Sequence, residues 1–452
     1  MLSCIGYITE PLQEHKSALK VRPVVNSEYH CGPVPSFNVF RTAKDGKLVV
    51  PRWWAEQNVG PAEKDIRPEP SRMGDHLRFT GKLRDSTQQP QALRAALEAG
   101  RGILSLPCGY GKTTVSLAIA MRLGWRTMVI VHKEFLAQQW IERIEQFCPG
   151  ARVGRVQRDL KEVEGCDFVI AMLQSLSQKE YSPKDFQSVG TVIVDEAHHI
   201  CAQVFSQSMF KVCPRHLFGL SATPVRKDGL TKVLEWFAGP TFFAVERPPE
   251  KGVEVIPLDF DCPAFRELPP QNRAGKISLT QMITDVVEMP ERNKMIEGVV
   301  RKLLETTRRH ILVLSDRRLH CQDLCSRFAP EDAGLYMGGM KQVELEESSR
   351  KRIIVATFSQ AHEGLDIPTL DTVILATPKS DIVQSIGRVM REGGNRAGHP
   401  LIYDLRDHWG VLWAMYSKRV RVYRRGGYNI TGEAPAVETE SPAPAGKCMI
   451  TL

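Results

Sequence analysis

The stretch 101-RGILSLPCGYGKTTVSLAIAMRL-123 decides the fold of the first half of this chain, because its pattern changes twice within a few residues. It begins as a short apolar run of strand length, passes through the turn CGYG, and continues with the spacing of a helix. This order is the context that a phosphate-binding loop requires. The strict loop pattern has a glycine six residues before the lysine, where this chain has Leu106, so a structural glycine turn stays the alternative until other motifs are found.

The loop contains each kind of group that a bound nucleotide needs. Gly109 and Gly111 allow backbone N–H groups to turn toward an anion, and the N-terminus of the helix adds a partial positive charge. Lys112 would reach the β and γ phosphates, and Thr113 would supply a hydroxyl to Mg²⁺. Thr114 follows in the same turn and belongs to the expected nucleotide-binding residues.

A second stretch, 191-TVIVDEAHH-199, is an apolar strand followed by two adjacent carboxylates. A carboxylate at the end of a parallel strand lies at the edge of the sheet where ligands bind. Asp195 fits a ligand of Mg²⁺, and Glu196 fits the base that positions a water molecule. A chance exposed pair of acids is the alternative, and the four β-favouring residues before Asp195 argue against it.

Two blocks of alternating strand-like runs and amphipathic helices follow one another along the chain. Because this alternation is typical of parallel sheets covered by helices, we predict an α/β protein with two such domains in tandem. A proline-rich segment of mixed charge between the blocks suits a connector. The predicted organisation is an N-terminal accessory domain over 1–80, domains over 81–245 and 290–430, a linker over 246–289, and a disordered tail over 431–452.

Within the accessory domain, the stretch 37-FNVFRTAKDGKLVVPRWW-54 has apolar runs on both sides of Asp45-Gly46, which predicts a hairpin. Its last residues, Trp53 and Trp54, could stack on bases. We favour packing in a core or between domains for both, because large aromatic side chains are most often buried.

Composition limits the remaining possibilities. At 452 residues the chain is long enough for about two or three domains. Its net charge of +8 is compatible with a polyanionic partner or with a solvated basic surface. The eleven cysteines show no pairs at zinc-ligand spacing, and their odd number without a secretory leader indicates a reducing compartment. No stretch is apolar enough to span a bilayer, so we expect a soluble intracellular protein of the nucleus or cytoplasm, without a membrane partner.

Five motifs together resemble those of superfamily 2 helicases, in order and approximate spacing, over residues 80–425. A finer similarity is to XPB-like helicases and to helicases of large DNA viruses, including the poxvirus transcript-release type. The resemblance implies two RecA-like domains, ATP and Mg²⁺ as cofactors, and DNA or RNA as the substrate. The motifs are 107-PCGYGKT-113, 195-DEAH-198, 221-SATP-224, 355-VATFSQAHEGLDIP-368 and 384-QSIGRVMR-391.

The resemblance also implies roles for residues of the second block. Arg388 and Arg391 correspond to arginines that stabilise the charge on the γ-phosphate, with Gln384 beside them. Gly364 and Asp366 match a motif that touches both the nucleotide and the nucleic-acid backbone.

In the first block, Ser221 and Thr223 match the motif that couples the γ-phosphate to strand binding, and His198 is grouped with them. XPB-type relatives carry a glutamine upstream of the phosphate loop that contacts the edge of adenine. Here Gln89 is the favoured match and Gln88 is nearly as good, so use of other nucleotides stays open.

Polar and basic residues that follow predicted strands suit contacts with a nucleic-acid backbone. The stretch 417-SKRVRVYRRGGY-428 also combines basic residues with two tyrosines, and it predicts either a nucleic-acid contact or a solvated helix end. The expected backbone contacts are His132, Lys133, Gln174, Ser175, Arg317 and Thr357.

The sequence therefore predicts an ATP-dependent helicase or translocase, with transcription or repair proteins as possible partners and no prediction of oligomeric state. A translocase that remodels protein–DNA complexes without separating strands has the same motifs and stays open. A nucleotide-gated clamp without turnover is disfavoured, because Lys112, Glu196 and Arg388 are all present. A GTPase or small-molecule kinase would not need the second block.

Overall fold

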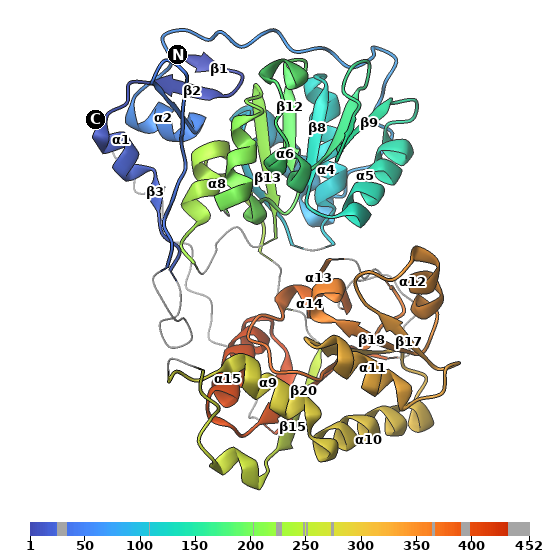
Figure 1. Cartoon of the computed structure of the whole chain (residues 1–452). Helices are drawn as coiled ribbons and strands as arrows, with labels where there is room; N and C mark the ends of the chain where they lie inside the picture. The colour runs from blue at the N-terminus through green and yellow to red at the C-terminus, as the bar shows by residue number, and fades with distance from the viewer. Residues whose placement is uncertain are drawn as a thin grey trace, which may run out of the picture. The chain divides into compact units, whose positions relative to one another are not determined.

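The computed structural model divides into two compact units, 1–247 and 248–452 (Figure 1). Each unit is an α/β structure with one large sheet covered by helices, which confirms the predicted fold class. No helix among the described residues is long and apolar enough to cross a membrane. The structure describes residues 1–24, 34–107, 109–201, 203–222, 228–246, 249, 252–272, 275–363, 367–389 and 398–432.

The first unit is built on an eight-stranded sheet with the order β10-β9-β11-β8-β12-β13-β7-β14. All neighbouring pairs are parallel except β10 with β9. The strands are β7 (Gly102–Ser105), β8 (Thr127–Val131), β9 (Val153–Gln157), β10 (Leu160–Lys161), β11 (Phe168–Met172), β12 (Thr191–Val194), β13 (His216–Ser221) and β14 (Thr241–Ala244).

Helices cover both faces of this sheet, as its uniformly buried strands β7, β8, β11 and β12 require. One apolar cluster packs the side chains of α3, α4 and α5 against one face, and another packs α6 and α8 against the other. The helices are α3 (Gln89–Ala99), α4 (Lys112–Leu123), α5 (Glu134–Phe147), α6 (Leu173–Gln178), α7 (Gln203–Ser206) and α8 (Thr231–Ala238).

The N-terminal segment forms a small antiparallel sheet with the order β1-β2-β6-β5. The predicted hairpin is confirmed: β5 pairs with β6, and Gly46 in the turn has a φ of 82°, which favours glycine. Trp54 is 4% exposed and packs in the core of this segment, so its predicted packing role is also confirmed. The elements are β1 (Leu2–Ser3), β2 (Gly6–Thr9), α1 (Gln13–Ala18), β3 (Lys20–Val21), β4 (Phe37–Asn38), β5 (Arg41–Thr42), β6 (Leu48–Val50) and α2 (Arg52–Asn58).

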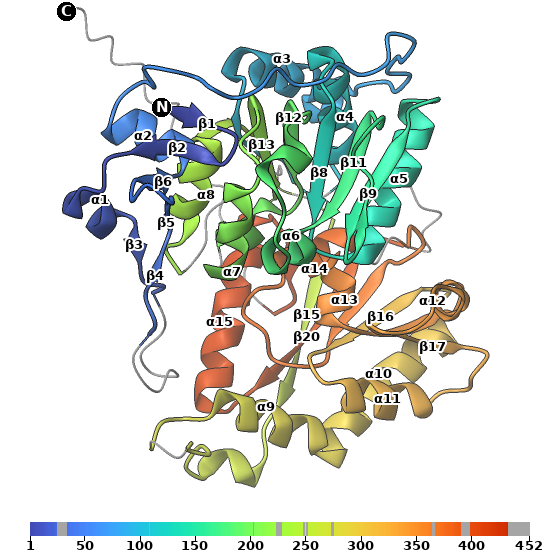
Figure 2. The same ribbon diagram turned by 45° about the horizontal axis from the view of Figure 1, so that its top comes forward.

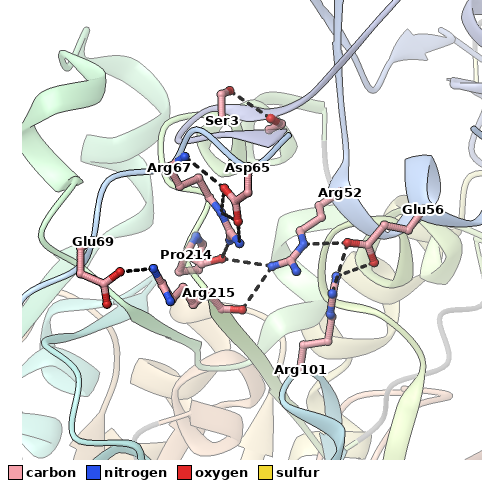
Figure 3. Close-up of polar contacts among 10 residues, drawn as sticks. Ser3, Arg52, Glu56, Asp65, Arg67, Glu69, Arg101, Pro214 and Arg215 are labelled. Carbon is pink, nitrogen blue, oxygen red and sulfur yellow. Dashed lines mark hydrogen bonds and ion pairs between the residues drawn. The ribbon is translucent and has the colours of Figure 1, made fainter. Parts of the chain in front are cut away.

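Arginines attach the N-terminal segment to the loop before β13 (Figure 3). Arg67 donates to the backbone carbonyl of Pro214 at 2.6 Å, and it also forms an ion pair with Asp65 at 2.7 Å. Arg52 donates to the carbonyl of Arg215 at 3.2 Å. Because β13 ends at the predicted coupling residue Ser221, these bonds connect the N-terminal segment to a strand of the candidate site.

The second unit contains a seven-stranded, fully parallel sheet with the order β17-β18-β16-β19-β20-β15-β21. Its strands are β15 (Glu254–Phe260), β16 (Ile311–Ser315), β17 (Ala333–Tyr336), β18 (Ile353–Thr357), β19 (Thr372–Leu375), β20 (Leu401–Asp407) and β21 (Asn429–Ile430). Its helices are α9 (Leu279–Glu288), α10 (Pro290–Thr306), α11 (Arg318–Ser326), α12 (Gln342–Ser349), α13 (Phe358–Glu363), α14 (Val383–Val389) and α15 (Gly410–Arg425).

The structure corrects part of the predicted linker. Residues 254–260 form β15, which pairs with β20 along its whole length and so belongs to the second sheet. The sequence did not predict this strand because it contains Pro257, and proline is rare within strands. The neighbouring β21 pairs only with Glu254 and Val255, so one side of β15 is unpaired at Pro257, where a missing N–H is tolerated. The predicted disordered tail lies outside the described residues from 433 onward.

We predict that Arg67→Ala lowers the free energy of unfolding by about 1–3 kcal/mol, because a hydrogen-bonded, nearly buried guanidinium is lost. Urea unfolding followed by circular dichroism would measure the change. Arg266→Ala is the control, because Arg266 forms an exposed ion pair with Asp261 and should cost less than about 1 kcal/mol. Equal midpoints for both variants would show that Arg67 does not hold the N-terminal segment.

Candidate nucleotide site

The carboxyl ends of four neighbouring parallel strands define the candidate site. In the order β8-β12-β13-β7, these strands end next to His132, Asp195, Ser221 and the phosphate loop. Each register aligns the strands in parallel, so their carboxyl ends meet at one edge of the sheet. Motifs separated by more than 100 residues are therefore brought to one place.

The phosphate loop joins β7 to α4 and contains two glycines in left-handed conformations. Gly109 has a φ of 86° and Gly111 a φ of 77°, so both positions favour glycine. A Cβ atom at Gly111 would meet the Nε2 atom of Gln89, so the Gln89 side chain would have to shift, and the positive φ would strain any substitution there. Thr113 and Thr114 lie in the first turn of α4 and are partly exposed, while Cys108 lies outside the described residues.

Gln89 is packed against the loop and is 1% exposed, whereas Gln88 is exposed. The Nε2 atom of Gln89 donates to the carbonyl of Tyr110 at 2.8 Å, and its Oε1 atom accepts from the backbone N–H of Arg84 at 2.8 Å. Arg84 in turn donates to the carbonyl of Gly109 at 2.9 Å. These bonds hold the loop in shape, and contact of Gln89 with adenine stays a prediction.

Lys112 is the first residue of α4 and points toward the acidic end of β12. Its Nζ atom lies 3.9 Å from Oε1 of Glu196 and donates to the carbonyl of Leu106 at 3.5 Å. Both distances are long for an ammonium group, and the side chain is 13% exposed. A strongly anionic phosphate would be a better partner for this ammonium group than either contact.

Asp195 has a partner that the sequence did not predict. Trp140, on α5, donates its Nε1–H to Oδ2 of Asp195 at 2.9 Å, and the backbone N–H of Glu196 donates to Oδ1 at 3.0 Å. Trp140 is 2% exposed. In the sequence, its helical spacing indicates only a core residue and not a partner of Asp195. Burial raises the pKa of the Asp195 carboxyl, and the nearby Glu196 carboxylate raises this pKa further.

Glu196 occupies an unusual backbone conformation directly after β12. Its φ is 46°, which is uncommon for a residue with a side chain and typical of functional positions. Its Oε2 atom lies 3.5 Å from Nδ1 of His198. The ring of His199 lies 3.9 Å from that of His132 and 4.4 Å from that of His198, so the histidines connect the ends of β8 and β12.

The residues of this edge fit a nucleotide and a divalent cation. A glycine loop at a helix N-terminus, with a lysine in its first turn, presents N–H groups and positive charge to phosphates. The partly buried carboxylate of Asp195 and the hydroxyl of Thr113 are oxygen donors of the kind that Mg²⁺ prefers. Removal from water raises the pKa of Asp195 because it destabilises the charged carboxylate. A bound cation would stabilise that negative charge.

The predicted nucleic-acid residues of the first unit lie at the same edge, but some of their groups are used internally. His132 is 7% exposed, and burial lowers its pKa, as does the charge of Lys133. Burial also lowers the pKa of Lys133. Gln174 donates to the carbonyl of His132 at 2.6 Å, and Ser175 accepts from the backbone N–H of Arg158 at 2.9 Å.

In the second unit, Arg317 caps α11 and donates to the carbonyl of Thr280 at 3.0 Å. Thr357 ends β18, is 7% exposed, and lies 3.3 Å from the hydroxyl of Ser359. Gln384 and Arg388 fall on α14, where their side chains are not described. The predictions for Thr223, Gly364, Asp366 and Arg391 lie outside the described residues.

The two α/β units, and the phosphate loop beside paired acids in the first of them, define a protein of the nucleotide-hydrolysing helicase class. Residues 82–226 match the family model described as type III restriction enzyme, res subunit. The chain is 30% identical over 433 residues to a candidate ATP-dependent RNA helicase, L396, of Acanthamoeba polyphaga mimivirus, covering 93% of this chain and 83% of that relative. The chain belongs to the superfamily 2 helicases of large DNA viruses.

Two further comparisons are of lower identity. A candidate helicase, 161L, of Invertebrate iridescent virus 6 is 27% identical over 378 residues, covering 77% of this chain and 82% of the relative. The crystal structure of T4 UvsW is similar over 92% of this chain and 94% of that chain, with 17% identity and a TM-score of 0.34.

We predict that Trp140→Phe raises the Mg²⁺ concentration needed for half-maximal ATP hydrolysis by about tenfold, because a partner that orients the carboxylate predicted to bind Mg²⁺ is lost. Hydrolysis rates over a Mg²⁺ titration at fixed ATP would measure the effect. Trp236→Phe is the matched control, since Trp236 is a partly buried tryptophan of α8. An unchanged Mg²⁺ dependence in Trp140→Phe would show that the bond does not orient Asp195.

Proposed function

We propose that this protein is an ATP-dependent motor that moves along DNA or RNA, with or without separating strands. The observation behind the proposal is the meeting of Lys112, Asp195 and Glu196 at one edge of the first sheet, with Lys112 3.9 Å from Glu196. A lysine for phosphate and two acids with different partners are the groups that hydrolysis of a phosphoanhydride needs. ATP is the expected nucleotide.

Each residue of the site has a distinct proposed task. Lys112 binds the β and γ phosphates together with the loop N–H groups. Glu196 orients a water molecule and accepts its proton at a carboxylate oxygen. Mg²⁺, held by Asp195 and Thr113, would neutralise phosphate charge when bound. Trp140 keeps the carboxylate of Asp195 in one orientation by its hydrogen bond.

We further propose that Arg388 and Arg391, with Gln384, stabilise the charge that develops on the γ-phosphate, and that Gly364 and Asp366 contact the nucleotide. Ser221, Thr223 and His198 would couple this site to the nucleic acid. If the affinity for a strand differs between the nucleotide-bound and product states, hydrolysis produces movement. The relatives named above include an RNA helicase candidate, so RNA belongs among the substrates to be tested.

We expect that at least one of single-stranded DNA, duplex DNA and RNA raises ATP turnover about tenfold or more, a barrier change of about 1.4 kcal/mol. Lys112→Ala and Arg388→Ala should abolish the stimulated rate, because each removes a cation from the phosphates. Steady-state ATPase assays with each nucleic acid would measure this. The controls are Lys302→Ala and Arg308→Ala, which change exposed cations of the same types outside the motifs.

ATP turnover that is absent, or that no nucleic acid changes, would contradict the motor proposal, and absent turnover would favour a nucleotide-gated clamp. A strand-displacement assay on a duplex with a single-stranded end then separates the two forms of the motor. Displacement indicates a helicase, whereas stimulated ATPase with removal of a bound protein and no displacement indicates a remodelling translocase. Either result would fit an expected role in transcription or repair.

A further inference from the structure

Helix α15 has an unusual composition for a surface helix, since its sixteen residues include no aspartate or glutamate. The sequence of residues 417–428, which include the second half of α15, predicted either a nucleic-acid contact or a solvated helix end. The structure separates the polar residues of this stretch into a buried group and an exposed group. The two groups have different functions.

The buried group is structural. Arg419 is 1% exposed and forms a 2.8 Å ion pair with Asp404, while it also donates to the carbonyl of Lys379 at 2.8 Å. Tyr423 is fully buried and donates to Oδ2 of Asp404 at 2.7 Å. These bonds attach α15 to the middle of β20 and to the loop that follows β19. Tyr423 is therefore not available to stack on a base.

The exposed group lies on the opposite side of the helix. At 3.6 residues per turn, Lys418, Arg421 and Arg425 lie within an arc of about 60° and over about 10 Å of helix. All three are exposed, and the structure gives their side chains no ion pair or hydrogen bond with the described residues. Figure 2 shows α15 as a long helix of the second unit. The three cations form one row of unneutralised charge.

An exposed aromatic ring lies nearer the N-terminus of α15, about 80° around the helix from Arg421 and about 140° from Lys418. Trp413 is 40% exposed, and its ring lies 4.7 Å from that of His408. The guanidinium of Arg406 lies 6.0 Å from the centre of the same ring. Arg406 and His408 both contact the carboxylate of Asp259, so the charge of Arg406 already has an acidic partner. They support the indole from the protein side, while part of it faces solvent.

A favourable interaction with the helix dipole does not explain this arrangement. Cations in the last turn stabilise a helix C-terminus, which accounts for Arg424 and Arg425. Lys418 and Arg421 precede that turn, and an exposed tryptophan gains nothing from the dipole. A row of cations without acids and an exposed indole on the same helix are the two features that bind single-stranded nucleic acid, by phosphate neutralisation and by stacking. An acidic protein surface would explain the cations but not the indole.

We propose that the exposed surface of α15, which carries the cations Lys418, Arg421 and Arg425 and, further round the helix, Trp413, is a nucleic-acid contact outside the helicase motifs. The three cations bind consecutive phosphates without reading sequence, and Trp413 stacks on an unpaired base. This inference rests on the proposed function, because it adds a second contact for the nucleic acid on which the motor acts. Its loss should weaken binding without changing the basal ATPase rate.

The charge test replaces Lys418, Arg421 and Arg425 together by glutamine, which keeps side-chain length and helix propensity. The plot of log Kd against log salt for a labelled single-stranded RNA or DNA should lose a slope of about 2, because each phosphate contact with a single strand contributes about 0.7. The matched control replaces Lys294, Lys302 and Arg308 by glutamine, which removes the same charge from exposed positions of α10 and the loop after it.

The stacking test compares Trp413→Phe with Trp413→Ala. We expect Trp413→Ala to weaken binding of single strands about tenfold and Trp413→Phe to weaken it much less, because phenylalanine still stacks. Binding of a blunt duplex should change little in either variant, since its bases are paired. Thermal melting of each variant would confirm that α15 is still folded.

Three outcomes would overturn the inference. The first is a salt slope that is unchanged in the triple glutamine variant, and the second is an equal loss of slope in the α10 control, which would show that only total charge matters. Unchanged nucleic-acid binding in all α15 variants would leave an acidic protein as the occupant of this face and would also reject the proposal. The proposed function is tested separately, because it fails only if nucleic acid does not stimulate the wild-type ATPase.

Discussion

The burial of parallel strands on both faces is the constraint on which the rest of this structure depends. Parallel strands need helical crossovers, and the crossovers cover both faces with apolar side chains. Polar groups that are to meet a ligand are then placed at the strand ends, where the helices do not cover the sheet. In the first unit this places the phosphate loop, Asp195 and Ser221 side by side at one edge, although they are far apart in the chain. The candidate site therefore lies at the strand ends because helices cover both faces of the sheet.

The sequence predicted those features that local pattern determines. Apolar runs of strand length predicted the two blocks, and glycines with a following helix predicted the loop, because both signals lie within a few consecutive residues. Contacts between distant residues could not be predicted in this way. Trp140 is 55 residues before Asp195, and its periodicity indicates only burial, so nothing in the sequence showed that its N–H reaches the carboxylate. The strand β15 was missed because Pro257 is rare in strands, and only the short neighbour β21 makes it acceptable there.

The N-terminal segment belongs to the same physical unit as the first large sheet. Its arginines donate to backbone carbonyls just before β13, and that strand ends at Ser221. A carbonyl that accepts a hydrogen bond from a charged donor moves less than one that faces water, because a charge-assisted hydrogen bond is stronger than a neutral one. We infer that residues outside the motifs help to fix a strand whose end belongs to the candidate site. Truncation of the segment would therefore be expected to alter the site as well as stability.

The distribution of arginines explains how a net charge of +8 can produce a local surface for a polyanion. A buried guanidinium is tolerated only with a carboxylate partner, because desolvation of an unpaired charge is too costly. Arg292 with Asp407 and Arg419 with Asp404 obey this rule in the second unit. Buried carboxylates that pair with buried arginines are not available to neutralise lysines and arginines on the surface. Helix α15 shows both cases. Its buried Arg419 pairs with Asp404, and its exposed cations Lys418, Arg421 and Arg425 have no acid beside them among the described residues. Helical periodicity thus converts a basic stretch that was ambiguous in sequence into one structural face and one face available to nucleic acid.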